Sequence, residues 1–300
     1  MKKAVLLAAL TLGVLMLGTA GWWGYQYVQY RQHLPTLDLV VNDVAREYHI
    51  YVPRTDSKDE FALVVLLQGG DAGSWRFAQQ HRWEVLADKL GVILVQPVGY
   101  KLPHNEGAWQ LDTHAGATQD VEFISAMLKD VAANYAIDER KVYAVGYSMG
   151  SMFSYELACQ MSGRFIAIAS HAGSMPIYPR DCNPTRHVPI MHLHGVDDPI
   201  IAYSNRWDWK AWPTVGTMQD VPGLIDYWST KYACKGERVM TENGTTHFVY
   251  ADCEQGGRIE HYKIEDIGHD WPDQIFGRST HQVIWDFFTE VSATEQPKTG

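Results

Sequence analysis

The chain has 300 residues, 46% of them hydrophobic, so it can bury the core of one large α/β domain or of two small domains. Its formal net charge at pH 7 is −10, and neither sign of charge forms a long run. An acidic surface of this kind is unfavourable for binding nucleic acid or anionic lipid, and we expect neither as a partner.

The N-terminus predicts export. Lys2 and Lys3 precede residues 4–30, which contain no charged residue. The small residues of Gly18-Thr-Ala20 offer a cleavage site for a signal peptidase, whereas the aromatic residues that follow are typical of the end of a membrane span. The segment is therefore a cleaved signal peptide or an inner-membrane anchor over residues 4–27. Both interpretations place the rest of the chain in the periplasm or outside the cell.

The remaining chain alternates between β-like and helix-like segments. This alternation predicts an α/β fold, with a mostly parallel sheet and helices on both faces. Continuous apolar stretches at 61–67 and 92–97 predict strands that are buried on both sides. We expect residues 31–39 to form a tether, residues 40–292 to form one domain and residues 293–300 to form a C-terminal tail.

Residues 146–150 form the pattern G-x-S-x-G between a β-like and a helix-like segment. A serine at the tip of a sharp strand-to-helix turn needs small residues two positions before and after it, because the two backbones nearly touch there. The free N–H groups of the helix N-terminus can stabilise an oxyanion. We predict Ser148 as a nucleophile and the Met149 N–H as one oxyanion donor.

A glycine-rich loop over residues 68–74 follows the first buried strand. In α/β hydrolases a loop in this position supplies the second oxyanion donor, and the backbone N–H of Gly70 or Asp71 is our candidate. A phosphate-binding loop is the rival interpretation, but lysine and serine or threonine do not stand at the required spacing.

The acid and the base follow in the order expected of an α/β hydrolase. Asp198, in the stretch His194-Gly-Val-Asp-Asp-Pro199, comes after a late strand and is the predicted acid, with Asp197 as the alternative. His269 follows the last predicted strand and is the predicted base.

His192 and His194 alternate along one strand and share a face, as metal ligands can. No third ligand stands at a recognisable spacing, so we predict no metal, and no other cofactor is expected.

The four cysteines of an exported chain predict two disulfides, with three possible pairings. Cys234 with Cys253 would close a hairpin that turns at Asn243-Gly244, leaving Cys159 with Cys182. Thiol catalysis is not expected, because no cysteine lies in an elbow or near a histidine.

These motifs together resemble the polyhydroxybutyrate depolymerase and feruloyl esterase-like branch of the α/β hydrolases over roughly residues 40–290. The most specific signature is H-x-W-P at 269–272, which general α/β hydrolases lack. The resemblance implies the same triad, Ser148, Asp198 and His269, and the cysteine positions also match. Gln68 replaces the family's usual histidine, and Ser151 replaces a common glycine. The matching stretches are residues 120–124, 142–150, 157–159, 162–165, 192–195, 198–200 and 268–272.

We therefore predict an exported serine esterase. Its substrate would be a polyhydroxyalkanoate oligomer, a feruloyl or acetyl ester of plant polysaccharide, or a small aliphatic ester. Trp271 and Trp109 are candidates for the pocket walls, with core packing as the alternative for both. A peptidase of the same fold and a catalytically silent hydrolase fold that serves as a binding module are the alternative functions. The sequence does not indicate an oligomeric state.

Overall fold

The structure is a computed structural model. It describes residues 21–22, 34–55, 60–70, 77–78, 81–99, 109–111, 119–179, 182–208 and 215–295. The predicted signal or anchor segment lies outside these residues except for Gly21 and Trp22. Among the described residues, no helix has both the length and the apolar character needed to cross a membrane.

Ten strands of the described chain form one large sheet. They are β1 (Thr36–Val41), β2 (Val44–Tyr51), β3 (Phe61–Leu67), β4 (Val92–Pro97), β5 (Ile137–Tyr147), β6 (Ala167–His171), β7 (Ile190–Gly195), β10 (Gly236–Glu242), β11 (Thr245–Ala251) and β12 (Ile259–Ile264). Their order is β1-β2-β4-β3-β5-β6-β7-β12-β11-β10. The strands from β4 to β12 in this order run parallel, and antiparallel strands form both edges. The predicted mostly parallel sheet is confirmed.

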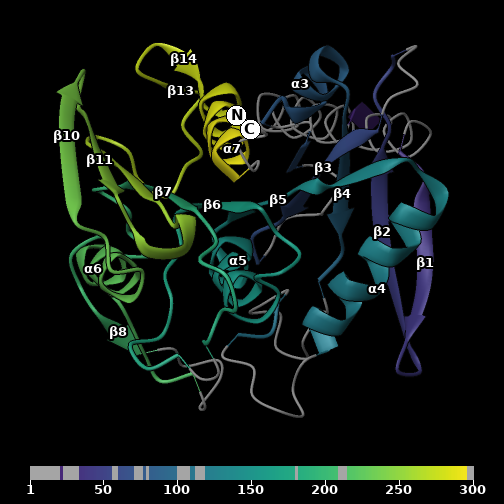
Figure 1. Cartoon of the computed structure of the whole chain (residues 1–300), viewed down its shortest axis with the longest axis horizontal. Helices are drawn as coiled ribbons and strands as arrows, with labels where there is room; N and C mark the ends of the chain where they lie inside the picture. Colours follow the sequence, from purple (N-terminus) through teal and green to yellow (C-terminus); the bar gives the residue numbers. More distant parts are fainter. Residues whose placement is uncertain are drawn as a thin grey trace, which may run out of the picture.

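Helices cover both faces of this sheet (Figure 1). The helices are α3 (Trp83–Leu90), α4 (Gln119–Asn134), α5 (Met149–Gln160), α6 (Val221–Lys231) and α7 (Thr280–Glu295). α4, α5 and α6 lie on one face, and α3 and α7 lie on the other. Each face has its own apolar core, because the side chains of the central strands point alternately to the two sides. The sheet is therefore the middle layer of three.

Short elements complete the described fold. β8 (Trp207–Asp208) pairs with β9 (Thr217–Met218), and β13 (Gln274–Ile275) pairs with β14 (Arg278–Ser279). A single turn of 3-10 helix, η1 (Glu254–Gly256), lies between β11 and β12. The hairpin of β10 and β11 turns at Asn243 and Gly244, as the sequence predicts, and both residues take the positive φ that a two-residue turn requires.

The folded domain begins earlier than the expected boundary at residue 40. β1 starts at Thr36 and pairs with β2 along its full length, and Leu34 is buried. The tether predicted for residues 31–39 was therefore wrong over its second half. β1 is an edge strand with only partly buried side chains, so its hydrophobic signal is weak.

Two disulfides lie on the face of the sheet that α4, α5 and α6 cover. They form one of the three pairings that the sequence allows. Cys159, in the last turn of α5, bonds to Cys182 in the segment before β7. Cys234, just after α6, bonds to Cys253, just after β11. No cysteine of the described residues is free.

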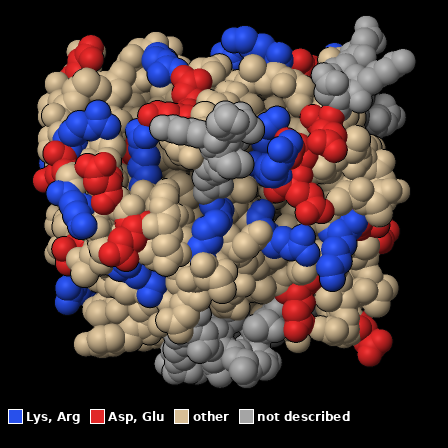
Figure 2. All heavy atoms as spheres, viewed as in Figure 1, with Lys and Arg blue, Asp and Glu red and all other residues tan. Residues whose placement is uncertain are grey.

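The surface carries both signs of charge. Figure 2 shows lysine and arginine interspersed with aspartate and glutamate over the displayed face, without a large area of one sign. This distribution accompanies the net charge of −10 and offers no basic stripe on that face.

Candidate active site

Ser148, Asp198 and His269 meet at the carboxyl ends of β5, β7 and β12. These strands lie close together in the sheet order and run parallel, so the segments that follow them emerge at one edge. Nε2 of His269 lies 2.9 Å from Oγ of Ser148, and Nδ1 of His269 lies 2.7 Å from Oδ2 of Asp198. The three residues predicted from separate motifs thus form one hydrogen-bonded chain.

The direction of each hydrogen bond in this chain follows from its acceptor. A carboxylate can only accept, so Nδ1–H of His269 donates to Asp198. Nε2 of His269 then carries a lone pair and accepts a hydrogen bond from the hydroxyl of Ser148. This tautomer can remove a proton from the serine oxygen.

Ser148 lies at a strained turn between β5 and α5. Its backbone φ is 54° with ψ of −118°, a region that residues other than glycine rarely occupy. A Cβ on Gly150 would lie 2.1 Å from the carbonyl oxygen of Leu67. A Cβ on Gly146 would lie 2.2 Å from the carbonyl oxygen of Gly150. Strand and helix backbones therefore touch on both sides of the serine, which explains the spacing of the two glycines.

Asp198 is buried, and four donors face its carboxylate. The backbone N–H groups of Ile200 and Ile201 each donate to Oδ1 at 2.8 Å, and His269 and His194 face Oδ2 at 2.7 and 3.4 Å. Burial alone would raise the pKa of Asp198, but these hydrogen bonds outweigh it and hold the pKa well below its usual range. The aspartate is therefore ionised near pH 7. Asp197, the alternative acid, is exposed.

The loop that carries His269 is held by side chains from β5 and β6. The hydroxyl of Tyr147 donates to the carbonyl oxygen of His269 at 2.5 Å, and Nε2 of His171 lies 2.9 Å from the carbonyl oxygen of Asp270. Burial raises the pKa of Tyr147 to about 12 and lowers that of His171 to about 3. Both groups are consequently neutral near pH 7. The neutral imidazole of His171 has a single N–H, and its other ring nitrogen, Nδ1, lies 3.1 Å from the carbonyl oxygen of Leu193. Tyr147 and His171 thus contact two consecutive carbonyl groups of the loop.

Trp271 of the H-x-W-P signature belongs to this loop and packs against aromatic side chains from outside it. Its ring stacks on His81 with centroids 4.5 Å apart and meets the edges of His171 and Phe77 at 5.1 and 5.4 Å. The side chain is half-buried. The contacts show that Trp271 anchors the loop of the candidate base, and its role as a pocket wall stays a prediction.

The glycine-rich loop lies against the elbow. A Cβ on Gly69 would be 3.2 Å from Cβ of Ser148, and one on Gly70 would be 3.3 Å from Cγ of Met149. The two candidate oxyanion donors, the N–H groups of Gly70 and Met149, therefore come from neighbouring segments beside the serine. Asp71, the other candidate, lies outside the described residues.

Trp109 supports this loop from inside the core. Its indole N–H donates to the carbonyl oxygen of Gln68 at 2.9 Å, and its ring stacks on Phe153 at 4.8 Å. The side chain is 1% exposed, so Trp109 is a core residue here and does not line an open pocket. This result corrects its place among the pocket candidates.

Asp120, in the stretch 120–124 that resembles the family, holds the segment next to Trp109. Its Oδ2 accepts from the backbone N–H of Gln110 at 2.6 Å, and its Oδ1 forms a buried ion pair of 2.6 Å with Arg46. Gln110 follows Trp109 directly. The ion pair therefore links β2 and α4 to the segment that supports the oxyanion loop.

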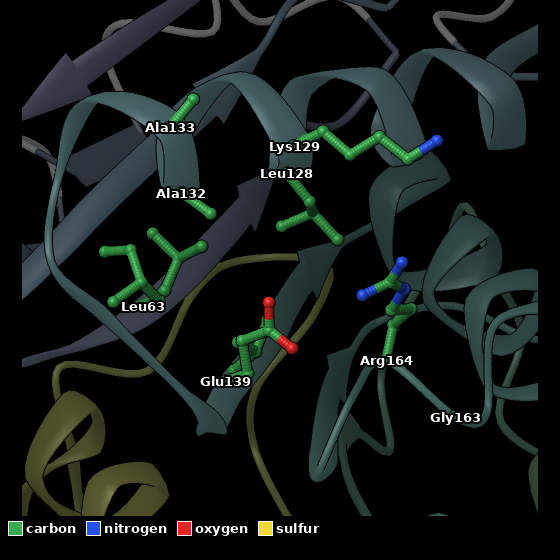
Figure 3. A pocket seen from close by; sticks show the side chains of 10 residues that line it. Leu63, Leu128, Lys129, Ala132, Ala133, Glu139, Gly163 and Arg164 are labelled. Carbon is green, nitrogen blue, oxygen red and sulfur yellow. The ribbon is translucent and has the colours of Figure 1, made fainter.

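A cavity of about 380 Å³ lies at the opposite end of the sheet (Figure 3). Leu63 comes from the first half of β3 and Ile137 is the first residue of β5, whereas Ser148 follows the end of β5. Lys129, Glu139 and Arg164 are also in its lining. Its position excludes this cavity as the place where Ser148 would meet a substrate.

The residues that hold the triad, Tyr147, His171 and His194, were not recognised from the sequence as positioning residues. Tyr147 is the variable second residue of G-x-S-x-G, and His171 ends a strand without any motif. In the sequence, His194 is a possible metal ligand beside His192 and the first residue of the stretch that contains Asp198. Tyr147 and His194 stand at the ends of strands that precede Ser148 and Asp198, and this position is the signal that the sequence offers for them. His171 ends β6, which precedes no member of the triad.

Comparison with known proteins identifies the family. The family described as "Esterase PHB depolymerase" matches residues 46–227, which is more than half of the chain. The chain belongs to this family of esterases. The matched region contains Ser148 and Asp198, and His269 lies beyond it.

Curated relatives point to the same group. The chain is 26% identical over 252 residues to a bifunctional acetylxylan esterase/xylanase, XynS20E, of Neocallimastix patriciarum, covering 82% of this chain and 33% of that protein. It is 25% identical over 226 residues to feruloyl esterase B of Piromyces equi, covering 74% and 40%. It is 31% identical over 266 residues to a probable feruloyl esterase C of Aspergillus terreus, covering 85% and 88%. The chain thus spans about a third of the first relative and two fifths of the second.

Solved structures show the fold. An acetyl xylan esterase from Aspergillus awamori superposes with a TM-score of 0.62 at 15% identity, covering 85% of this chain and 99% of that one. A ferulic acid esterase superposes with a TM-score of 0.53 at 16% identity, covering 87% and 97%. The predicted α/β-hydrolase fold is confirmed.

Proposed function

We propose that this protein is a serine esterase that hydrolyses carboxylic esters through an acyl-enzyme. The observation that carries the proposal is the hydrogen-bonded chain from Ser148 through His269 to the buried carboxylate of Asp198. Membership in an esterase family supports the same reaction.

In the first step Oγ of Ser148 attacks the ester carbonyl while Nε2 of His269 takes the hydroxyl proton. Asp198 holds the imidazole in the tautomer that permits this transfer and stabilises the imidazolium that forms. The returned proton leaves with the alcohol, and the acyl group stays on Ser148. A water molecule, deprotonated by the same nitrogen, then releases the acid and restores the serine.

The N–H groups of Met149 and Gly70 are the proposed oxyanion donors. Both belong to segments that lie against Ser148, and Met149 starts α5, where the N–H groups have no helical partner. Removal of one such donor in other hydrolases costs about 3 kcal/mol of transition-state stabilisation.

Feruloyl and acetyl esters of plant polysaccharide are the favoured substrates, because the relatives include acetylxylan and feruloyl esterases. Polyhydroxyalkanoate oligomers and small aliphatic esters are the other candidates. We also propose that the protein is exported, since two disulfides suit an oxidising compartment.

Initial rates on acetyl, butyryl and feruloyl esters test the reaction, with wild type compared with Ser148→Ala. Ser125→Ala on α4 is the matched control, because this half-buried serine lies far from the triad in the sequence and is bonded to none of its members. We expect wild-type and Ser125→Ala rates to agree, and the Ser148→Ala rate to fall by a factor of about 10⁴ or more.

Turnover by Ser148→Ala at the wild-type rate would refute the proposal. Wild-type protein that binds these esters without hydrolysing them would favour the silent binding module. Cleavage of peptides in preference to esters would favour the peptidase.

A further inference from the structure

A row of buried polar side chains extends behind Asp198, on the side away from His269. Nε2 of His194 lies 3.4 Å from Oδ2 of Asp198, and Nδ1 of His194 lies 3.1 Å from Nε2 of His192. Nδ1 of His192 lies 2.7 Å from the hydroxyl of Tyr155 on α5. The row thus connects the candidate acid to the helix that begins at the candidate nucleophile.

The acceptors fix the direction of every hydrogen bond in this row. Nε2 of His194 faces only acceptors, the carboxylate of Asp198 and the carbonyl oxygen of Ile201 at 2.8 Å, so it carries the proton. With this proton on Nε2, Nδ1 of His194 accepts the hydrogen bond that Nε2–H of His192 donates. His192 in turn accepts from the hydroxyl of Tyr155, and all donors point towards Asp198.

His194 holds the turn of residues 198–201 as well as the carboxylate. The backbone N–H of Ile201 donates to Oδ1 of Asp198, and the carbonyl oxygen of the same residue accepts from His194. Loss of the imidazole donor would release both Oδ2 and this carbonyl group. The orientation of Asp198 towards His269 therefore depends on a side chain that cannot itself reach the substrate.

Burial keeps His192, in the middle of this row, neutral. The side chains of His194 and Asp198 have no exposed surface, and His192 and Tyr155 are also buried. His261 on β12 and Ser170 on β6 also face His192. Desolvation, with the neighbouring histidines adding to it, lowers the pKa of His192 well below its usual range. His192 can therefore hold His194 in place without adding a charge of its own.

We propose that His194 is a positioning residue of the triad, and that His192 and Tyr155 hold it in the tautomer that donates to Asp198. The inference rests on the proposed esterase function. In this arrangement the acid of the triad is oriented from two sides, by His269 on the substrate side and by His194 on the core side.

Two substitutions of His194 separate positioning from packing. His194→Leu keeps most of the volume and removes the donor, whereas His194→Gln keeps an N–H donor near the position of Nε2. We expect His194→Leu to lower kcat about tenfold with KM within twofold of wild type, as for one lost hydrogen bond to a charged acceptor. His194→Gln should recover most of this loss.

The pH profile supplies a readout that packing alone would not move. In His194→Leu the carboxylate of Asp198 loses one donor, so more of its charge acts on His269 and favours the imidazolium form. We expect the acidic limb of kcat/KM to move to higher pH by a few tenths of a unit, on the order of a few tenths of a kcal/mol of extra interaction.

His261→Gln is the matched control, because His261 is equally buried on the neighbouring strand and contacts only His192 and Tyr203 through its ring nitrogens. The His261→Gln variant should be less stable than wild type but keep the acidic limb of the kcat/KM profile at the same pH. Tyr155→Phe removes only a hydroxyl and gives a second test if His194→Leu does not fold. It should lower kcat a few-fold. Where His194→Leu does fold, the effect of Tyr155→Phe should disappear in that background, because the row acts as a unit.

The outcomes are distinct. An active wild type whose His194→Leu and Tyr155→Phe variants keep the wild-type kcat and acidic limb would overturn the inference and leave the esterase proposal intact. A wild type without ester hydrolysis would overturn the proposed function itself. A lowered kcat with a shifted limb, restored by His194→Gln and absent in His261→Gln, is the result that the geometry predicts.

Discussion

Gly150→Ala tests how closely the elbow is coupled to the oxyanion loop. The added methyl carbon would lie 2.1 Å from the carbonyl oxygen of Leu67 and 2.5 Å from that of Gln68, whereas ordinary contacts begin near 3.4 Å. The end of β3 and the start of α5 must therefore separate by roughly 1 Å. Gln68 immediately precedes the glycines of the candidate oxyanion loop, so this separation moves the Gly70 donor away from Ser148.

Both stability and rate should respond. Overpacking of this kind costs about 1–3 kcal/mol in unfolding free energy, and a displacement of ~1 Å at a catalytic group costs about 100-fold in rate. Gly163→Ala is the control, since Gly163 is exposed, has an ordinary φ and has no atom within 4 Å of a built Cβ. It should change the unfolding free energy by less than about 0.5 kcal/mol.

The assay pairs thermal unfolding with kcat/KM for a p-nitrophenyl ester, measured on wild type and the two glycine variants. A folded Gly150→Ala protein with kcat/KM within threefold of wild type would show that the strand-to-helix contact does not set the oxyanion geometry. An equal loss in Gly163→Ala would show that the effect is not specific to the elbow.

Three further predictions concern the acid, the buried histidines and one disulfide. Asp198→Asn should lower kcat by about 10⁴ because the amide favours the wrong tautomer of the base. The pKa of the Asp198 carboxyl is lower in the folded state than its ordinary value of 3.8. Its contribution to stability is therefore present above this value and is lost progressively as the pH falls below about 4. Urea unfolding of the wild type from pH 5 to pH 3 measures this loss. His171 and His261 have pKa values lowered by burial to about 3. Each binds a proton only on unfolding, so the unfolding free energy should fall by about 1.4 kcal/mol per histidine and per pH unit below 6.5. His261→Gln should reduce that slope by one proton, and an unchanged slope would contradict the assignment. Replacing Cys234 and Cys253 together by serine should cost about 3 kcal/mol in urea unfolding, and a cost near zero would show that the bond does not restrain the unfolded chain.

The triad could be predicted from the sequence because each member follows a recognisable strand. Val142 to Val145 and the stretches at 61–67 and 188–193 are apolar enough to be buried in a parallel sheet, and glycines mark the sharp turns that follow. Parallel strands end at one edge, so residues far apart in the chain can be brought together from pattern alone.

The supporting residues could not be predicted because their partners depend on strand order. His171 reaches the loop of the candidate base only because β6 lies between β5 and β7, and His194 reaches the turn after Asp198 only through the fold of that turn. Nothing local in the sequence specifies these neighbours. Trp109 and Trp271 look equivalent in the sequence, and only the packing shows that the first is core and the second anchors a loop.

The start of the domain also could not be predicted from the hydrophobic pattern. Thr36–Val41 is short, partly polar and half-exposed, as an edge strand can be, so its periodicity does not distinguish it from a tether. Pairing with β2, which is a tertiary contact, makes it a strand.

Mapping the adduct of a fluorophosphonate probe by peptide mass spectrometry tests the central claim most directly. We predict one adduct for each chain, on Ser148, formed at a rate that falls steeply in His269→Ala and absent in Ser148→Ala. Ester hydrolysis by a wild-type protein that carries no adduct on Ser148, or an adduct on another residue that abolishes hydrolysis, would contradict the assignment of this serine as the nucleophile.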